Sequence, residues 1–164
     1  MSSDSSTAVD FDFIRMHPLF NGISDEDLRR FQAYLIHERI EAGQTIIQEG
    51  EQGDCMYILL DGMLEVLKRV VSKEQLGLER IAILEAGDTF GEMEFIDKQS
   101  RSATVRVLED CSVVIIKDAT MWKVAEQDCM TFSRLLLNLA KQVSMRLRKT
   151  DAYFAGSLFS LRRR

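Results

Sequence analysis

The stretch FGEMEFIDKQSRSAT, residues 90–104, decides the fold because it interrupts an otherwise regular series of short apolar segments. Gly91 allows the backbone to approach a ligand closely, since glycine carries no Cβ. Glu92 can accept a hydrogen bond from a sugar hydroxyl, and Arg101 offers a forked, permanently charged partner for phosphate oxygens. These residue types at this spacing suit a pocket for one small sugar that carries a phosphate.

Residues 90–97 do not alternate between apolar and polar, so they predict a short helical turn rather than another strand. A helix buried inside a small roll leaves backbone N–H groups without partners, and consecutive N–H groups at its start can point at an anion. A bound phosphate would satisfy them. The alternative is purely structural: Glu92 favours the positive end of the helix, and Arg101 is its ion-pair partner across a turn.

Composition indicates one globular domain with terminal extensions, since the chain has 164 residues and is 46% hydrophobic. The net charge of −5 argues against bulk electrostatic binding to nucleic acid. We expect no membrane span and no secretion signal, because no apolar run reaches about 18 residues and the N-terminus lacks a basic segment. Three cysteines without paired spacing favour a reducing compartment, so we expect a cytoplasmic protein.

Short strands with a turn about every ten residues predict an antiparallel sandwich, roll or barrel. Helices are expected only at the two ends, which indicates an α+β protein. Asp61-Gly62 and Glu109-Asp110 are interpreted as turns between consecutive strands. The expected strands are residues 36–40, 45–47, 55–60, 63–71, 78–84, 103–108 and 112–116, with a loop over residues 72–77.

Helix signals lie on both sides of the strands. Ser24, three positions before Asp27, is typical of a helix N-cap. His17 and His37 are the only histidines, and neither has other candidate ligands nearby, so we expect both to be structural or exposed. The expected helices cover residues 10–16, 25–35, 118–127 and 130–148.

Several groups of residues together carry a resemblance to a known family. They are Gly91-Glu92-Met93 with Arg101-Ser102-Ala103-Thr104, the segment HPLF at 17–20, Gly50 with Gly53-Asp54, and YILLDG at 57–62. In this combination the chain resembles the cyclic nucleotide-binding domain, the module of catabolite-activator-type regulators, kinase regulatory subunits and nucleotide-gated channels. The resemblance covers residues 12–148.

The resemblance implies an antiparallel, jelly-roll-like β-roll with a short phosphate-cassette helix and flanking helices, which binds a cyclic mononucleotide. It implies that Glu92 holds the ribose 2′-hydroxyl, that Arg101 holds the cyclic phosphate, and that Gly91 and Ser102 add close contacts. By analogy, and because Ser102 replaces a threonine of cyclic GMP-preferring domains, cyclic AMP is the expected ligand. We expect no metal or other cofactor. The expected ligand-binding residues are Gly91, Glu92, Met93, Glu94, Arg101, Ser102 and Ala103.

Two positions depart from the family pattern. Glu94 stands where the family has a small residue whose backbone N–H faces the phosphate. Its carboxylate would repel an anion if it pointed inward and stayed dry, and would matter little if it pointed into water. Ser100 stands where the family often has proline, which costs only some loop rigidity.

The last expected helix carries an apolar stripe at helical spacing. The stripe can pack against the roll of the same chain, and the family analogy adds pairing with the same helix of a second copy in a homodimer. Leu135, Leu137 and Ala140 form a second apolar patch, so one helix has room for both uses. Trp122 is expected to be a core anchor. The stripe consists of Phe132, Leu136, Leu139, Val143 and Leu147.

The domain boundaries follow from these assignments. The tail after the domain holds aromatic residues, leucines and a terminal run of three arginines, and we expect it to be disordered or to pack on itself. A lid over the pocket, a docking strip and a weak membrane-surface anchor are its other interpretations. The expected parts are a mobile tail over residues 1–9, the domain over 10–148 (helices 10–35, roll 36–116, helices 118–148) and the tail over 149–164.

The expected function is a non-enzymatic sensor that binds a cyclic mononucleotide and relays the signal through its C-terminal helix to a partner protein. The relay would work by population shift. The alternative is a degenerate relative that serves as a protein-interaction or dimerisation module, with Glu92 and Arg101 paired with each other. A nucleotide-acting enzyme is disfavoured, because the sequence shows no nucleophile with a paired base and no cluster of metal ligands.

Overall fold

The computed structural model describes residues 9–71 and 76–161. Six strands form one antiparallel sheet flanked by helices, which confirms the expected α+β roll, although the sheet is not closed. The expected N-terminal tail up to residue 8, most of the expected loop and the last three arginines lie outside the described residues. In chain order the elements are α1 (Phe11–Met16), the 3₁₀ turn η1 (Pro18–Phe20), α2 (Asp25–Gln32), β1 (Ile36–Ile40), β2 (Thr45–Ile47), β3 (Cys55–Val71), β4 (Leu76–Leu84), β5 (Thr89–Phe90), α3 (Met93–Asp97), β6 (Thr104–Lys117), α4 (Asp118–Gln127) and α5 (Cys129–Leu161).

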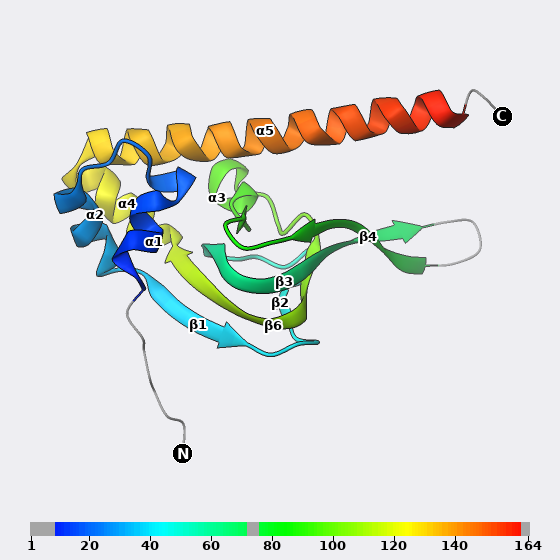
Figure 1. The fold of residues 1–164 in the computed structure, drawn as a ribbon, viewed down its shortest axis with the longest axis horizontal. Helices are drawn as coiled ribbons and strands as arrows, with labels where there is room; N and C mark the ends of the chain where they lie inside the picture. Colours follow the sequence, from blue (N-terminus) through cyan, green and yellow to red (C-terminus); the bar gives the residue numbers. More distant parts are fainter. Residues whose placement is uncertain (1–8, 72–75, 162–164) are drawn as a thin grey trace, which may run out of the picture.

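The two longest strands, β3 and β6, form the centre of the sheet. The strand order is β1-β6-β3-β4, with β2 added to β6 and β5 added to β3. In Figure 1 the helices α1, α2 and α4 gather at one end of the sheet, and α5 runs from that end past α3. The short helix α3 therefore lies between the sheet and α5, where it can border a site.

The predicted turns at Asp61-Gly62 and Glu109-Asp110 are wrong, because both segments lie inside continuous strands. The pairing between β3 and β6 changes register near Asp61, so the two segments form a bulge. The Asp61 carboxylate accepts hydrogen bonds from the backbone N–H of Ser112, at 3.0 Å, and from the Ser112 hydroxyl. An Asp-Gly pair suits both a tight turn and a bulge, and only the partner strand distinguishes them.

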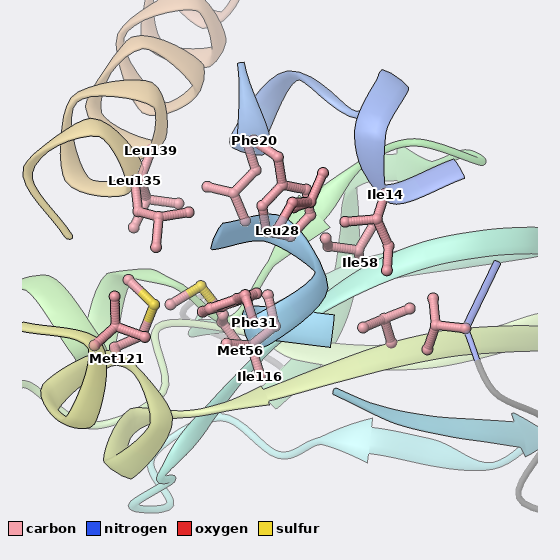
Figure 2. Close-up of a cluster of buried hydrophobic side chains, with 14 of the residues drawn as sticks. Ile14, Phe20, Leu28, Phe31, Met56, Ile58, Ile116, Met121, Leu135 and Leu139 are labelled. Atoms are coloured by element: carbon pink, nitrogen blue, oxygen red, sulfur yellow. The ribbon is translucent and has the colours of Figure 1, made fainter. Parts of the chain in front are cut away.

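Two clusters of buried side chains form the core. The smaller cluster fills the roll and includes Leu59, Leu64, Phe90 and Val113. The larger cluster packs the helices against one end of the sheet, as Figure 2 shows. Its side chains come from both termini of the domain and from the central strands, so the helices close that end. They include Ile14, Phe20, Leu28, Phe31, Met56, Ile58, Ile116, Met121, Leu135 and Leu139.

Helix α2 begins as predicted and ends earlier. The Ser24 hydroxyl accepts the backbone N–H of Asp27 at 3.1 Å, which confirms the N-cap. The helix ends at Gln32 rather than at Leu35. The backbone N–H of Leu35 bonds the carbonyl of Gln32, a tighter turn that leads directly into β1.

Helix α5 corrects one expectation about the C-terminal part and confirms another in part. It runs without a break to Leu161, so the expected boundary between residues 148 and 149 is not an end of secondary structure. The expected packing of the apolar stripe against the same chain is confirmed for its first part: Leu139 is buried in the core, whereas Leu147, two turns later, is 59% exposed. Phe132 and Leu136 are partly buried against the same core. Pairing with a second copy stays a prediction, but Leu139 is not available for it in this conformation.

Trp122 is not the core anchor that we expected, because its side chain is 49% exposed. Its ring lies against Phe95 of α3, with ring centroids 5.6 Å apart, and against Phe132 of α5, at 5.8 Å. The chain's single tryptophan therefore joins three helices at the edge of the core.

His17 is structural, as expected. Its Nε2–H donates to the carbonyl of Gly87 at 2.9 Å, and its Nδ1 accepts the backbone N–H of Leu19. This pattern requires a neutral ring with the proton on Nε2. Burial lowers the pKa of His17 below its ordinary value of 6.5.

The bulge predicts that Gly62→Ala destabilises the fold by about 2 kcal/mol or more. Gly62 has φ +88°, and an added Cβ would lie 2.5 Å from the Cβ of Cys111 and 2.6 Å from the carbonyl oxygen of Asp110. Gly43 has φ +87° with no atom within 4 Å, so Gly43→Ala costs only the backbone strain, about 1 kcal/mol. Urea unfolding measures both values. Equal losses for the two variants would contradict the crowded bulge.

The buried imidazole predicts a pH-dependent stability. Below its unfolded pKa of 6.5, His17 takes up a proton in the unfolded chain but not in the folded one. The free energy of unfolding should therefore fall as pH drops below about 6.5, by at most about 1.4 kcal/mol per pH unit, and stay level just above it. Urea unfolding in the variant His37→Gln, where His17 is the sole histidine, should keep this slope. His17→Gln should lose it.

Candidate functional site

All seven expected ligand-binding residues border one cavity. The cavity has a volume of about 80 Å³ and lies among α3, the sheet and α5. The predicted residues around it are Gly91, Glu92, Met93, Glu94, Arg101, Ser102 and Ala103, and those that the sequence did not indicate are Ile47, Val66, Leu84, Phe90, Val105 and Arg146.

The segment before α3 is held by strand β5. Phe90 pairs with Tyr57 of β3, and the two rings stack with centroids 5.0 Å apart. Burial raises the pKa of the Tyr57 phenol, so this side chain stays neutral next to the charged groups of the cavity. Phe95 anchors α3 in the larger core cluster. Glu92 takes the N-cap position of α3 without a capping hydrogen bond, which leaves its carboxylate to the cavity.

Arg101 is 7% exposed, and its guanidinium is held by two hydrogen bonds to carbonyls and by one ion pair. Nη1 donates to the carbonyl of Gly91 and Nη2 to that of Cys55, both at 2.7 Å. Nε lies 3.1 Å from Oε2 of Glu94. A Cβ on Gly53 would lie 2.1 Å from Nη2, so this position has to be glycine for the arginine to lie there. The glycine-rich corner before β3 thus provides the space for Arg101.

Glu94 points inward, which decides the question that the sequence left open. Its side chain is 7% exposed. Its Oε1 accepts the backbone N–H of Gly53 at 2.6 Å, and its Oε2 faces Arg101. The charge of Arg101 is therefore balanced by a carboxylate of the same cassette, at the position expected to face the phosphate.

Glu92 is buried and does not pair with Arg101. Its Oε1 lies 3.0 Å from Nη2 of Arg146 on α5, and the same nitrogen donates to the carbonyl of Thr89 at 3.1 Å. The second oxygen, Oε2, is buried without a hydrogen-bond partner. The pairing of Glu92 with Arg101 that we expected for a degenerate relative is therefore wrong, because each glutamate of the cassette has a different arginine.

Arg146 is the residue that the sequence interpretation missed. It lies seven positions after the buried Leu139, so it falls on the face of α5 that turns toward the domain. A basic residue on the otherwise apolar face of a helix was the available signal. The sequence carried no signal for its partner, because Glu92 belongs to a distant segment.

The remaining predicted residues form the edge of the cavity. Met93 is 46% exposed, and Ser102 is exposed with its hydroxyl 3.5 Å from the sulfur of Met93. The ammonium of Lys68 donates to the carbonyl of Ser102 and to the carboxylate of Glu49. The cavity therefore has an exposed rim and a charged interior.

The cavity is smaller than a small-molecule site. Ligand pockets have volumes of roughly 300 Å³ or more, and this one has about 80 Å³. Its interior holds two carboxylates and two guanidiniums that neutralise each other in pairs. A nucleotide would need this conformation to open.

The chain belongs to the cyclic nucleotide-binding domain family, since the model of that family matches residues 37–128, more than half of the chain. It is 28% identical over 139 residues to the cyclic AMP receptor protein of Thermus thermophilus, which covers 82% of this chain and 59% of that protein. A cyclic nucleotide-binding domain from Methylobacillus flagellatus has the same fold, with a TM-score of 0.82 at 22% identity over 90% of this chain and 83% of that one.

The chain spans only part of the curated relatives that it matches. It covers 8% of patatin-like phospholipase domain-containing protein 6 from Pongo abelii, to which it is 27% identical over 119 residues, or 72% of this chain. In the part that the structure describes, no helix is both long and apolar enough for a membrane span. No cluster of three or more histidine, cysteine or acidic side chains suits a metal ion among residues 9–71 and 76–161.

The buried ion pair predicts that Arg101→Met lowers the free energy of unfolding by about 3 kcal/mol, because Glu94 would stay buried without its counter-ion. Adding Glu94→Ala to this variant should recover part of the loss. As a control, Arg30→Met removes an exposed pair with Glu26 and should cost below about 1 kcal/mol. Urea unfolding measures all three. A double variant less stable than Arg101→Met alone would contradict a coupled pair.

Proposed function

We propose that this domain is a non-enzymatic sensor that binds a cyclic mononucleotide, with cyclic AMP preferred over cyclic GMP, and relays binding through α5 to a partner protein. One observation supports the relay above others: Arg146 of α5 forms an ion pair with Glu92, the residue that the family resemblance assigns to the ribose 2′-hydroxyl. Three unpaired cysteines fit the cytoplasmic location that we also propose.

Oε2 of Glu92 has no partner and could accept a ribose hydroxyl, but the cavity of about 80 Å³ is too small for a nucleotide while Arg146 borders it. We infer that ligand binding widens the cavity by moving Arg146 away from Glu92. Because Arg146 is fixed to α5, its departure favours another position of that helix. A ligand that binds the open form better shifts the population toward it, and a partner that prefers the open form raises ligand affinity equally.

Glu94 would weaken the attraction for the phosphate. Arg101 is already balanced by this carboxylate, so an incoming phosphate meets a neutral pair instead of a free cation. Nη1 has two N–H groups and donates to one carbonyl, so one donor remains for a phosphate oxygen, whereas Nη2 donates to both the carbonyl and the sulfur of Cys55. We infer that the site binds cyclic nucleotides more weakly than it would with a small residue at position 94.

The second candidate function is an interaction module that binds no nucleotide. The small cavity, the buried Arg101–Glu94 pair and the half-buried Arg146–Glu92 pair favour it, because they form a complete arrangement without a ligand. Exposed apolar side chains on α5, among them Leu137 and Leu147, would then serve a protein partner or a second copy. Nucleotide titration separates the two functions.

The sensor proposal predicts that cyclic AMP binds and changes the fluorescence of Trp122, which contacts both α3 and α5. Arg146→Ala should raise the affinity about tenfold, since the ligand no longer displaces an arginine worth about 1.4 kcal/mol. The control Arg148→Ala, an exposed residue on the same helix, should change it less than twofold. Calorimetry and fluorescence titration measure these affinities, after circular dichroism has confirmed that each variant is folded.

Two further arms of the titration decide between the functions. Glu94→Ala should raise the affinity for cyclic AMP, and Glu92→Gln should lower it strongly. If neither the natural chain nor Arg146→Ala nor Glu94→Ala binds cyclic AMP or cyclic GMP at millimolar concentration, the sensor function is refuted and the interaction module is favoured. Unchanged nucleotide after long incubation is expected, because the proposal includes no hydrolysis.

A further inference from the structure

A second cavity, of about 200 Å³, lies beside the first and shares Arg146 with it. Thr89 borders the second cavity and Phe90 the first, as expected for consecutive strand residues that point to opposite faces. We propose that the second cavity binds a small oxyanion with the chemistry of phosphate. This site is separate from the one that the family resemblance assigns to the nucleotide.

Two buried polar groups of this cavity have no partner. The side chain of Thr89 is buried, the residue being 3% exposed, and its Oγ1 makes no hydrogen bond. Nε2 of Gln142 on α5 is also buried and unpaired. Buried polar groups nearly always find partners, because leaving one unpaired is costly. Both residues border the cavity, and a small movement of their side chains would let an oxyanion accept hydrogen bonds from both groups.

Two cations border the same cavity. Gln142, Arg146 and Lys149 recur at helical spacing, so α5 turns all three toward the cavity. Lys149 makes no ion pair within the part of the chain that the structure describes. A guanidinium, an ammonium, an amide N–H and a hydroxyl are all hydrogen-bond donors, and together they suit a multiply charged group of oxygen acceptors.

The other groups facing the cavity offset only part of this charge, since one carboxylate faces two cations. Asp88 is its one acidic residue, and its Oδ2 already accepts the backbone N–H of Glu85 at 2.8 Å. His17, which holds the carbonyl of Gly87 behind the cavity, stays neutral because burial lowers its pKa. A volume of about 200 Å³ equals roughly six water molecules at about 30 Å³ each, enough for a phosphate with accompanying water.

Because Arg146 borders both cavities, an oxyanion in the second one competes with Glu92 for it. Binding of the anion would therefore free the Glu92 carboxylate. Under the proposed sensor function, and only there, phosphate should then raise the affinity of the first cavity for cyclic AMP. Occupation of the second cavity does not itself depend on that function.

The test is a calorimetric titration with inorganic phosphate, without nucleotide, at constant ionic strength held with chloride. Saturable binding is expected in the natural chain. Thr89→Val keeps the shape of the side chain and removes the unpaired hydroxyl, and it should weaken phosphate binding about tenfold, as should Lys149→Gln. Arg148→Gln removes the same charge from a residue that borders neither cavity, and it should change binding less than twofold.

The outcomes separate a built site from general attraction. Absence of saturable binding, or equal weakening by Lys149→Gln and Arg148→Gln with no effect of Thr89→Val, would overturn the proposal. Thermal unfolding of Thr89→Val checks that the variant is folded, and it should be at least as stable as the natural chain, since no hydrogen bond is lost. Phosphate binding that leaves the affinity for cyclic AMP unchanged would refute the shared role of Arg146, while the proposed oxyanion site itself would stand.

Discussion

The burial of one guanidinium governs the structure around the cavity. Arg101 is taken out of water, so its N–H groups need partners within the protein. The carbonyls of Cys55 at the start of β3 and of Gly91 before α3 accept hydrogen bonds from it, and the carboxylate of Glu94 within α3 forms an ion pair with it. These contacts join three segments to the loop that carries the arginine. Gly53 makes the arrangement feasible, because any larger side chain would occupy the place of the guanidinium.

The second buried glutamate connects this cassette to the far end of the chain. Glu92 is balanced by Arg146, and α5, which carries that arginine, is anchored in the core through Leu135 and Leu139. The position of the helix and the charge inside the cavity therefore change together. A helix held by apolar contacts at one end and by an ion pair further along can release the second contact without losing the first.

Many features of the fold and of the cavity could be predicted from the sequence where the signal was local. The N-cap at Ser24, the structural role of His17 and the grouping of the seven cassette residues around one cavity all follow from neighbours a few positions apart or from the family resemblance. The failures were also informative. Asp61-Gly62 had the composition of a turn, yet pairing with Ser112 of β6 made it a bulge, and Trp122, expected as a core anchor, lies half-exposed at the edge of the core.

The sequence by itself determined the fold family, the short helix that interrupts the series of strands and the identity of the charged residues in the cassette. Only the tertiary structure decided which charges meet: Glu94 turns inward to Gly53, 41 positions earlier, and Arg146 reaches Glu92 from the last helix. Caps and strand periodicity arise from backbone geometry over a few residues, so they can be read in order along the chain. The partner of a buried charge depends on which distant segment shares its low-dielectric surroundings, and that is settled only when the chain packs.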